Sequence, residues 1–61
     1  MPFIEVKRYD RRVSPEASEK IIKEMTDALC RACGEEVREH TWVVVQGVPA
    51  NQWGIAGNAG S

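Results

Sequence analysis

Several features of larger or specialised proteins are scarce in this 61-residue sequence, which has one histidine, two cysteines and a net charge of −1. No apolar run approaches the roughly 20 residues of a membrane-spanning helix, so we expect no transmembrane segment. The nearly neutral charge argues against a nucleic-acid-binding domain. The N-terminus alternates charged and apolar residues, unlike a secretory signal peptide. We therefore expect a small cytoplasmic protein that binds neither membranes nor nucleic acid.

Large apolar residues are also scarce, because valine, isoleucine, leucine and phenylalanine together make up only about a fifth of the chain. The length allows one domain, over residues 1–61. A domain this short buries a small fraction of its surface, and most such domains rely on disulfides, a metal or oligomerisation. We expect this chain to find its missing core in partner subunits.

The two cysteines, Cys30 and Cys33, form a C-x-x-C spacing. A zinc site would need two further ligands, and His40 is the only histidine, so we expect no metal site. A reactive thiolate is favoured at a helix N-terminus, whereas these residues fall near the end of the helix predicted below. We expect plain reduced thiols, and an incidental disulfide is the alternative.

The first half of the chain predicts a strand followed by a helix. Residues 2–9 alternate in the period of a half-buried strand. Ser14 and Pro15 are typical of a helix start, apolar residues then recur with the 3.6-residue helical period, and Gly34 suits the position that ends a helix. The predicted helix therefore has about 19 residues.

The second half predicts another strand and a tail. Residues 41–46 form a valine-rich run, typical of a strand in a parallel pair beneath a helix. Residues 47–61 predict turns and a short hairpin, with Trp53 and Ile55 as the large apolar anchors. The whole is one β-α-β unit, a small α/β (α+β) fold. One face of its sheet would be bare, which predicts that protomers associate through their sheets.

Proline at position 2, directly after the initiator methionine, is the sharpest chemical feature of the sequence. Removal of Met1 would leave Pro2 with a free secondary amine, a rigid base at the start of a strand. Burial and neighbouring cations disfavour the charged form of an amine and lower its pKa toward neutrality. A base with a pKa near the working pH suits proton transfer. The alternative is that Pro2 merely begins the strand, where its missing N–H is harmless.

Four of the eight basic residues gather at the far end of the strand that Pro2 begins: Lys7, Arg8, Arg11 and Arg12. Guanidinium groups present a planar fork to oxyanions, so the cluster is a candidate clamp for a carboxylate or enolate. The alternative is a solvated end paired with Asp10 and Glu16. A strand of eight residues spans more than about 20 Å, so these arginines are candidates for the site of a neighbouring subunit.

Five features occur together in this sequence: Met-Pro-Phe-Ile-Glu-Val, an arginine at the strand–helix connection, one long helix, a valine-rich strand and Asn-Gln-Trp-Gly-Ile-Ala-Gly. In this combination the sequence resembles the 4-oxalocrotonate tautomerase family of the tautomerase superfamily. The resemblance covers essentially the whole chain. It implies β-α-β protomers that dimerise into a four-stranded sheet with two helices and usually assemble as hexamers. It also implies that Met1 is removed, that Pro2 is the general base and that no cofactor is needed.

The resemblance also implies roles for individual residues. The catalytic arginine of the family falls on Arg12, and Arg11 stands where a glycine is usual. Arg8 matches an additional arginine of 3-chloroacrylic acid dehalogenases. The aromatic wall of the family falls on Trp53, for which a purely interface role is the equal alternative, and Phe3 would supply a second apolar wall.

One position departs from the family, because Trp42 stands where relatives carry a second arginine. Arg38 is too far along the chain for a simple swap. The departure puts a dicarboxylate substrate in doubt, although several relatives work without that arginine. Trp42 itself is interpreted as a core or interface residue rather than a catalytic one.

Three hypotheses follow. The first is a cofactor-independent tautomerase, in which the carboxylate of a 2-hydroxy-dienoate or other enol of a 2-oxo acid binds Arg12. Pro2 would then take the enol proton and return one to a distant carbon. The second is a 3-haloacrylate dehalogenase or hydratase-like lyase, or one subunit of a hetero-oligomer. Gln52 argues against hydration, because it lies near the position where such relatives carry a water-activating glutamate, and a glutamine cannot act as that base. The third is a non-catalytic assembly module. The expected partners are a small acid substrate and further subunits, in a homo- or heterohexamer.

Overall fold

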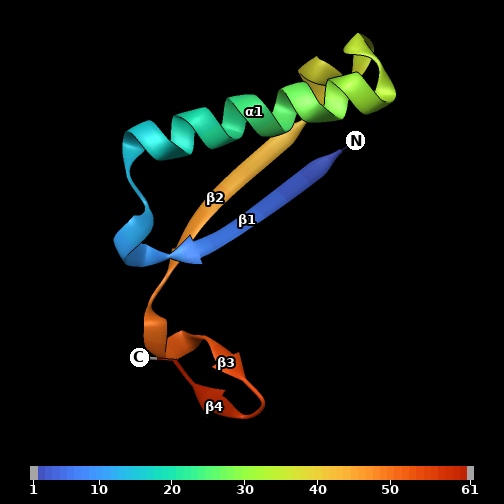
Figure 1. The fold of residues 1–61 in the computed structure, drawn as a ribbon. Helices are drawn as coiled ribbons and strands as arrows, with labels where there is room; N and C mark the ends of the chain where they lie inside the picture. The colour runs from blue at the N-terminus through green and yellow to red at the C-terminus, as the bar shows by residue number, and fades with distance from the viewer. Residues whose placement is uncertain (1, 61) are drawn as a thin grey trace.

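The structure is a computed structural model that describes residues 2–60. Two strands, a long helix, three short 3₁₀ helices and a small hairpin follow one another along the chain (Figure 1). In chain order they are β1 (Phe3–Tyr9), η1 (Asp10–Arg12), α1 (Pro15–Cys33), η2 (Glu35–His40), β2 (Trp42–Val48), η3 (Ala50–Gln52), β3 (Gly54–Ile55) and β4 (Asn58–Ala59).

The strands β1 and β2 are parallel, with Phe3 opposite Trp42 at one end and Tyr9 opposite Val48 at the other. Helix α1 crosses from the end of β1 back to the start of β2 and lies over one face of the pair (Figure 1). This arrangement confirms the predicted β-α-β unit.

Local sequence sets both ends of α1. The hydroxyl of Ser14 accepts a hydrogen bond from the backbone N–H of Ala17 at 3.1 Å, and Pro15 occupies the first turn, where no N–H partner is needed. At the other end the N–H of Gly34 donates to the carbonyl of Cys30 at 2.8 Å. Gly34 has φ 106°, a backbone conformation that would be strained in a residue with a side chain. The predicted 19-residue helix is confirmed.

Two segments differ from the sequence-based expectation. The acidic segment after α1, for which no helix was expected, forms the 3₁₀ helix η2. The second strand continues two residues beyond the predicted end at Gln46, to Val48. Gly47 continues the strand opposite Arg8 of β1, and the chain after β1 approaches it closely: an added Cβ would lie 3.1 Å from both the Cα of Asp10 and a methyl group of Val13.

The tail forms the expected hairpin, in which β3 and β4 pair antiparallel. Its two turn residues, Ala56 and Gly57, have φ 54° and φ 84°, as a tight two-residue turn requires. Ile55, expected to be an anchor, is 81% exposed and anchors nothing within this chain.

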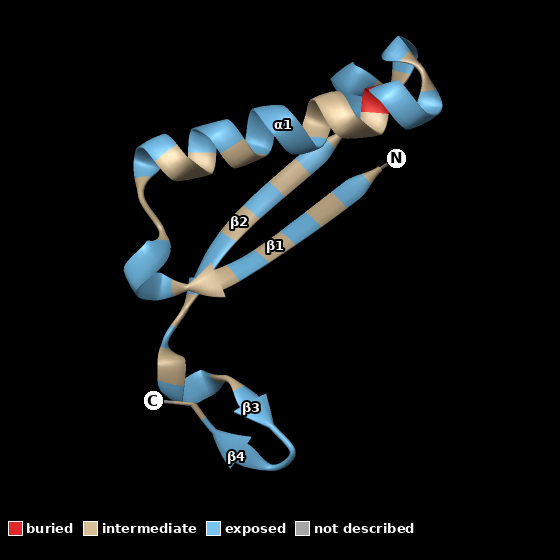
Figure 2. Ribbon diagram, in the orientation of Figure 1, coloured by how far each residue is buried: buried red, intermediate tan, exposed pale blue. Residues whose placement is uncertain are grey.

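The core of one chain is very small. Cys30 is the only buried residue among residues 2–60, at 5% exposure, and the strands alternate between half-buried and exposed residues (Figure 2). The accessible surface is 4702 Å² for 6.8 kDa, against about 3,950 Å² for a compact monomer of that mass. The radius of gyration is 14.1 Å, against about 10.5 Å for a compact domain of this length. The chain is therefore more extended than a compact domain of its length.

The sheet face away from α1 carries large apolar side chains in contact with solvent. Phe3 is 60% exposed, Trp42 58% and Val44 40%. On the same face Lys7 donates to Gln46 at 2.7 Å and pairs with Glu5 at 3.3 Å. Among the residues described, no helix combines the length and the apolar character needed to span a bilayer.

Candidate active site

Pro2 lies immediately before β1 and is half-buried. Its carbonyl accepts a hydrogen bond from the backbone N–H of Trp42 at 3.0 Å, which fixes the residue to the start of β2. Because Pro2 is the first residue of the paired segment, its lack of an N–H removes no hydrogen bond from the strand pair. Phe3 and Trp42, the next register pair, extend from the uncovered face beside it.

Arg38 lies in η2, near the start of β2, and is held by two carboxylates. Its Nε donates to Glu35 at 2.8 Å, and its Nη1 donates to Asp27 of α1 at 2.9 Å. These hydrogen bonds, first with Glu35 and then with Asp27, raise the pKa of Arg38. The pKa of Asp27 is lowered by its hydrogen bonds to Lys23 and then to Arg38. Arg38 therefore joins η2 to α1 and does not stand in for the arginine that relatives have at Trp42.

The opposite end of the β1–β2 pair carries a stack of three side chains. The rings of Tyr9 and Trp53 lie 5.2 Å apart between centroids, tilted by 46°. The indole N–H of Trp53 donates to the carbonyl of Val48 at 3.1 Å, which fastens the tail to the end of β2. The guanidinium of Arg11 lies over the Tyr9 ring, 4.6 Å from its centroid. The stack therefore holds one cation in a defined place.

The arginines at this end have no acidic partners. Arg12, the last residue of η1, is exposed. Among residues 2–60, neither Arg8, Arg11 nor Arg12 forms an ion pair with a carboxylate. The alternative of an end neutralised by Asp10 and Glu16 is therefore not observed in one chain.

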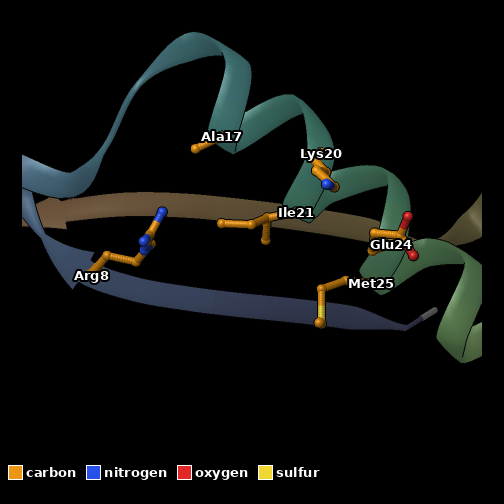
Figure 3. Close-up of a pocket in the computed structure, with 6 residues that line it drawn as sticks. All are labelled: Arg8, Ala17, Lys20, Ile21, Glu24 and Met25. Atoms are coloured by element: carbon orange, nitrogen blue, oxygen red, sulfur yellow. The ribbon is translucent and has the colours of Figure 1, made fainter.

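Arg8 is separated from the other arginines by the alternation of the strand. It is half-buried and points toward α1, into a hollow beneath the helix (Figure 3). The hollow is lined by Arg8, Ala17, Lys20, Ile21, Glu24 and Met25. The structure thus gives Arg8 no contact with the stack at Tyr9.

The predicted site residues fall into two groups at opposite ends of β1. Pro2 and Phe3 lie at its start, and Arg11, Arg12 and Trp53 lie around its end (Figure 1). Seven strand residues span about 23 Å. One chain therefore does not bring the proline to the arginines, and a site that uses both needs a second copy.

Sequence reasoning assigned no site role to Tyr9, which links Arg11 to Trp53. No sequence signal marked Tyr9, because its place opposite Val48 and the 3₁₀ turn that brings Trp53 back to it are features of the fold. The two cysteines are free thiols, Cys30 buried and Cys33 exposed. Within the described part of the chain, no three His, Cys, Asp or Glu side chains gather as metal ligands.

The chain is thus a small α+β protein built on a β-α-β unit, with Pro2 just before its first strand and, within residues 2–60, two arginines without ion-pair partners just after that strand. The chain matches the family model described as Tautomerase enzyme over residues 2–60. It therefore belongs to the tautomerase family, which confirms the resemblance found in the sequence. A search of curated proteins gave no match.

Proposed function

We propose that the chain is a cofactor-independent tautomerase that isomerises a 2-hydroxy-dienoate, or a related enol of a 2-oxo acid, to its keto form in the cytoplasm. The observation that carries the proposal is the pair of adjacent arginines, Arg11 and Arg12, which have no ion-pair partners within residues 2–60 and lie at the end of the strand that Pro2 begins. A pair of free guanidinium groups is a binding site for a carboxylate. The family match supports the tautomerase class of reaction.

The proposed mechanism begins with removal of Met1, which lies outside the described residues and whose amide bond would otherwise deny Pro2 any basicity. The free Pro2 nitrogen takes the proton of the enol hydroxyl. The electron pair left on oxygen forms the ketone, and the displaced π electrons take a proton from the Pro2 ammonium at a distant carbon. Arg12 holds the substrate carboxylate, and nearby cations stabilise the negative charge that develops on the dienolate.

Pro2 and the arginines of the site come from different copies in this proposal. The exposed face with Phe3, Trp42 and Val44 supports association, because large apolar side chains at solvent favour burial. We propose a hexamer, formed from this chain alone or with a related subunit. Sedimentation that gave a stable monomer at micromolar concentration would contradict this arrangement.

The test begins with the intact mass, which shows whether Met1 has been removed. The processed protein is then assayed for ketonisation of 2-hydroxymuconate and phenylenolpyruvate, beside Pro2→Ala and the control Pro15→Ala. We expect Pro2→Ala to lower kcat/KM by about 100-fold or more, because it removes a general base. Pro15→Ala should retain activity, because alanine is well tolerated in the first turn of a helix.

Other results would favour the remaining hypotheses. Full ketonisation by folded Pro2→Ala would reject the proposed base. Chloride release from 3-haloacrylates would favour the dehalogenase, and a need for a co-purified small partner would favour the hetero-oligomer. Inertness toward enols in protein with a free Pro2 would favour the assembly module.

A further inference from the structure

Tyr9, the last residue of β1, connects a cation of the candidate site to an aromatic side chain. Its ring centroid lies 5.2 Å from that of Trp53, and the guanidinium of Arg11 lies 4.6 Å from the Tyr9 centroid. The mechanism proposed above gives Tyr9 no part, although Arg11 makes its one aromatic contact within residues 2–60 with this ring.

We infer that Tyr9 is a positioning residue, whose ring holds the guanidinium of Arg11 in place as a second, fixed positive charge for the substrate carboxylate that Arg12 binds. The inference rests on the proposed function. Tyr9 itself does not touch the substrate in this arrangement. Its effect is therefore on substrate binding, and it depends on the presence of Arg11.

The Tyr9 ring is fixed from two sides of the fold. Tyr9 is half-buried and lies opposite Val48 in the strand pair. The carbonyl of Val48 also accepts the hydrogen bond from the indole of Trp53, at 3.1 Å. The N–H of Gly60 donates to the carbonyl of Trp53 at 2.8 Å, so the end of the hairpin holds this residue as well. The ring on which Arg11 rests is therefore a rigid support.

Arg11 and Arg12 are both exposed, but they differ in how they are held. The cation–π contact in the described part of the chain involves Arg11, and Arg12 has no such contact there. The negative face of an aromatic ring attracts a guanidinium. A long surface side chain loses rotamer freedom when a ligand immobilises it. Because Tyr9 already restricts Arg11, less of this cost remains when the substrate binds.

An aromatic support keeps the charge of an arginine available, whereas a carboxylate neutralises it. Arg38 shows the second case, because its guanidinium donates to Glu35 at 2.8 Å and to Asp27 at 2.9 Å. The Tyr9 ring is uncharged, and the Arg11 guanidinium forms no hydrogen bond within residues 2–60. Arg11 thus keeps both its charge and its N–H donors for a carboxylate.

The first experiment measures KM and kcat for ketonisation of 2-hydroxymuconate by protein that lacks Met1. Tyr9→Leu should raise KM about two- to fivefold, the size of an exposed cation–π contact. The value of kcat should change little, because a carboxylate is bound alike in the ground state and the transition state. Tyr9→Phe should restore the wild-type KM, because the Tyr9 hydroxyl forms no hydrogen bond within residues 2–60 and phenylalanine keeps the ring.

A double-mutant cycle shows whether Tyr9 acts through Arg11. In Arg11→Ala protein Tyr9→Leu should have no further effect on KM. In the matched Arg8→Ala protein it should keep its full effect, because Arg8 points toward α1, away from the stack (Figure 3). Additive losses in Tyr9→Leu and Arg11→Ala would overturn the inference, since Tyr9 would then act independently of Arg11.

A second series covers the case in which Tyr9→Leu does not fold. Phenylalanines of increasing fluorine content at position 9 keep the shape of the ring and weaken the negative face that attracts the cation. A chain of 61 residues is short enough for total synthesis, with Pro2 as its first residue. KM should rise stepwise with fluorination when Arg11 is present. A KM that does not change along the series would overturn the inference.

A binding measurement separates this inference from the proposed function. Wild-type protein with a free Pro2 that ketonises no enol would overturn the proposed function. The role of Tyr9 is then measured by titrating adipate against the fluorescence of Trp53 in Trp42→Phe protein, where Trp53 is the one remaining tryptophan. Tyr9→Leu should raise the dissociation constant about two- to fivefold. An unchanged constant, or no saturable response to adipate, would overturn the positioning role.

Discussion

The two ends of the β1–β2 pair carry two aromatic residues each and use them differently. At the arginine end Tyr9 and Trp53 stack on each other, Trp53 is hydrogen-bonded to Val48, and the stack supports the cation of Arg11. At the proline end Phe3 and Trp42 are unstacked and more than half exposed. The first pair holds the guanidinium of Arg11 in place, whereas the second pair exposes apolar surface to solvent.

The arginines at the two ends differ in whether carboxylates bind them. Arg38, near the proline end, is held by Glu35 and Asp27, whereas Arg11 and Arg12 have no acidic partners within residues 2–60. One end therefore offers a base and an apolar wall, and the other offers anion-binding groups. Acid–base chemistry on an anionic substrate needs both ends, which one extended chain holds about 23 Å apart.

The largest predicted effect tests whether the two ends meet between chains. Pro2→Ala and Arg12→Ala should each be nearly inactive alone. If the proline and the arginine of a site come from different copies, co-refolding the two variants in equal amounts should restore about a quarter of wild-type activity, by random pairing in a symmetric assembly. Ketonisation rates of the refolded mixture give the measurement.

The control for this experiment is the same mixture without denaturation, in which subunits have not been exchanged and activity should stay low. Co-refolded mixtures that remain inactive while sedimenting like the wild type would place both residues of the site in one chain, contrary to the separation seen here.

The next prediction compares the contributions of Arg11 and Arg12 to activity. Arg12→Ala should lower kcat/KM by about 100-fold or more, because it removes the group that holds the substrate carboxylate. Arg11→Ala should have a smaller effect, about tenfold, because its guanidinium rests on Tyr9 and contributes charge from a fixed position. Steady-state kinetics with Arg11→Lys as the conservative control would check this order, and equal losses in the two alanine variants would refute it.

Much of the fold could be predicted from the sequence because its determinants are local. The alternation of residues 2–9, the Ser14–Pro15 start and Gly34 define β1 and α1 without reference to distant residues. The short 3₁₀ helix η2 was not predicted, and one of its ion pairs joins Arg38 to Asp27 of α1, 11 residues away in the sequence. The extension of β2 through Gly47 and Val48 depends on pairing with Arg8 and Tyr9 of β1, which are distant in the sequence.

The separation of the candidate site residues could be predicted from the sequence, whereas their catalytic roles stay predictions. The motif pointed to Pro2, Arg12 and Trp53, and spacing along one strand already implied that they lie far apart. The position of Arg11 over Tyr9 could not be read from the sequence, because two adjacent arginines look alike until one of them stacks on a ring. The turn of Arg8 toward α1 follows only from strand alternation, which put it on the face of Ile4 and Val6.

A smaller effect concerns the ion pairs at the proline end. The pKa of Asp27 is lowered in the folded chain. Its charge therefore stabilises the fold at pH values above the pKa that Asp27 has in the unfolded chain, and this stabilisation is lost as the pH falls through its pKa in the folded chain. Asp27→Asn should therefore unfold earlier than wild type at pH 7, with the difference shrinking below about pH 4. Thermal unfolding across this range, with the exposed Glu19→Gln as control, gives the measurement. A difference that does not depend on pH would contradict the ion-pair account.

The smallest effect lies in the hairpin beyond the arginine end, where Ala56 has φ 54°. A side chain in the left-handed region costs about 1–2 kcal/mol, whereas glycine adds about 0.5–1 kcal/mol of backbone entropy to be lost on folding. Ala56→Gly should therefore raise the free energy of unfolding by up to about 1.5 kcal/mol, while Ala59→Gly, within β4, should lower it. Because neither side chain belongs to the arginine stack, kcat/KM should not change in either variant. Urea unfolding in which both substitutions destabilise the protein equally would mean that the turn is not strained at Ala56.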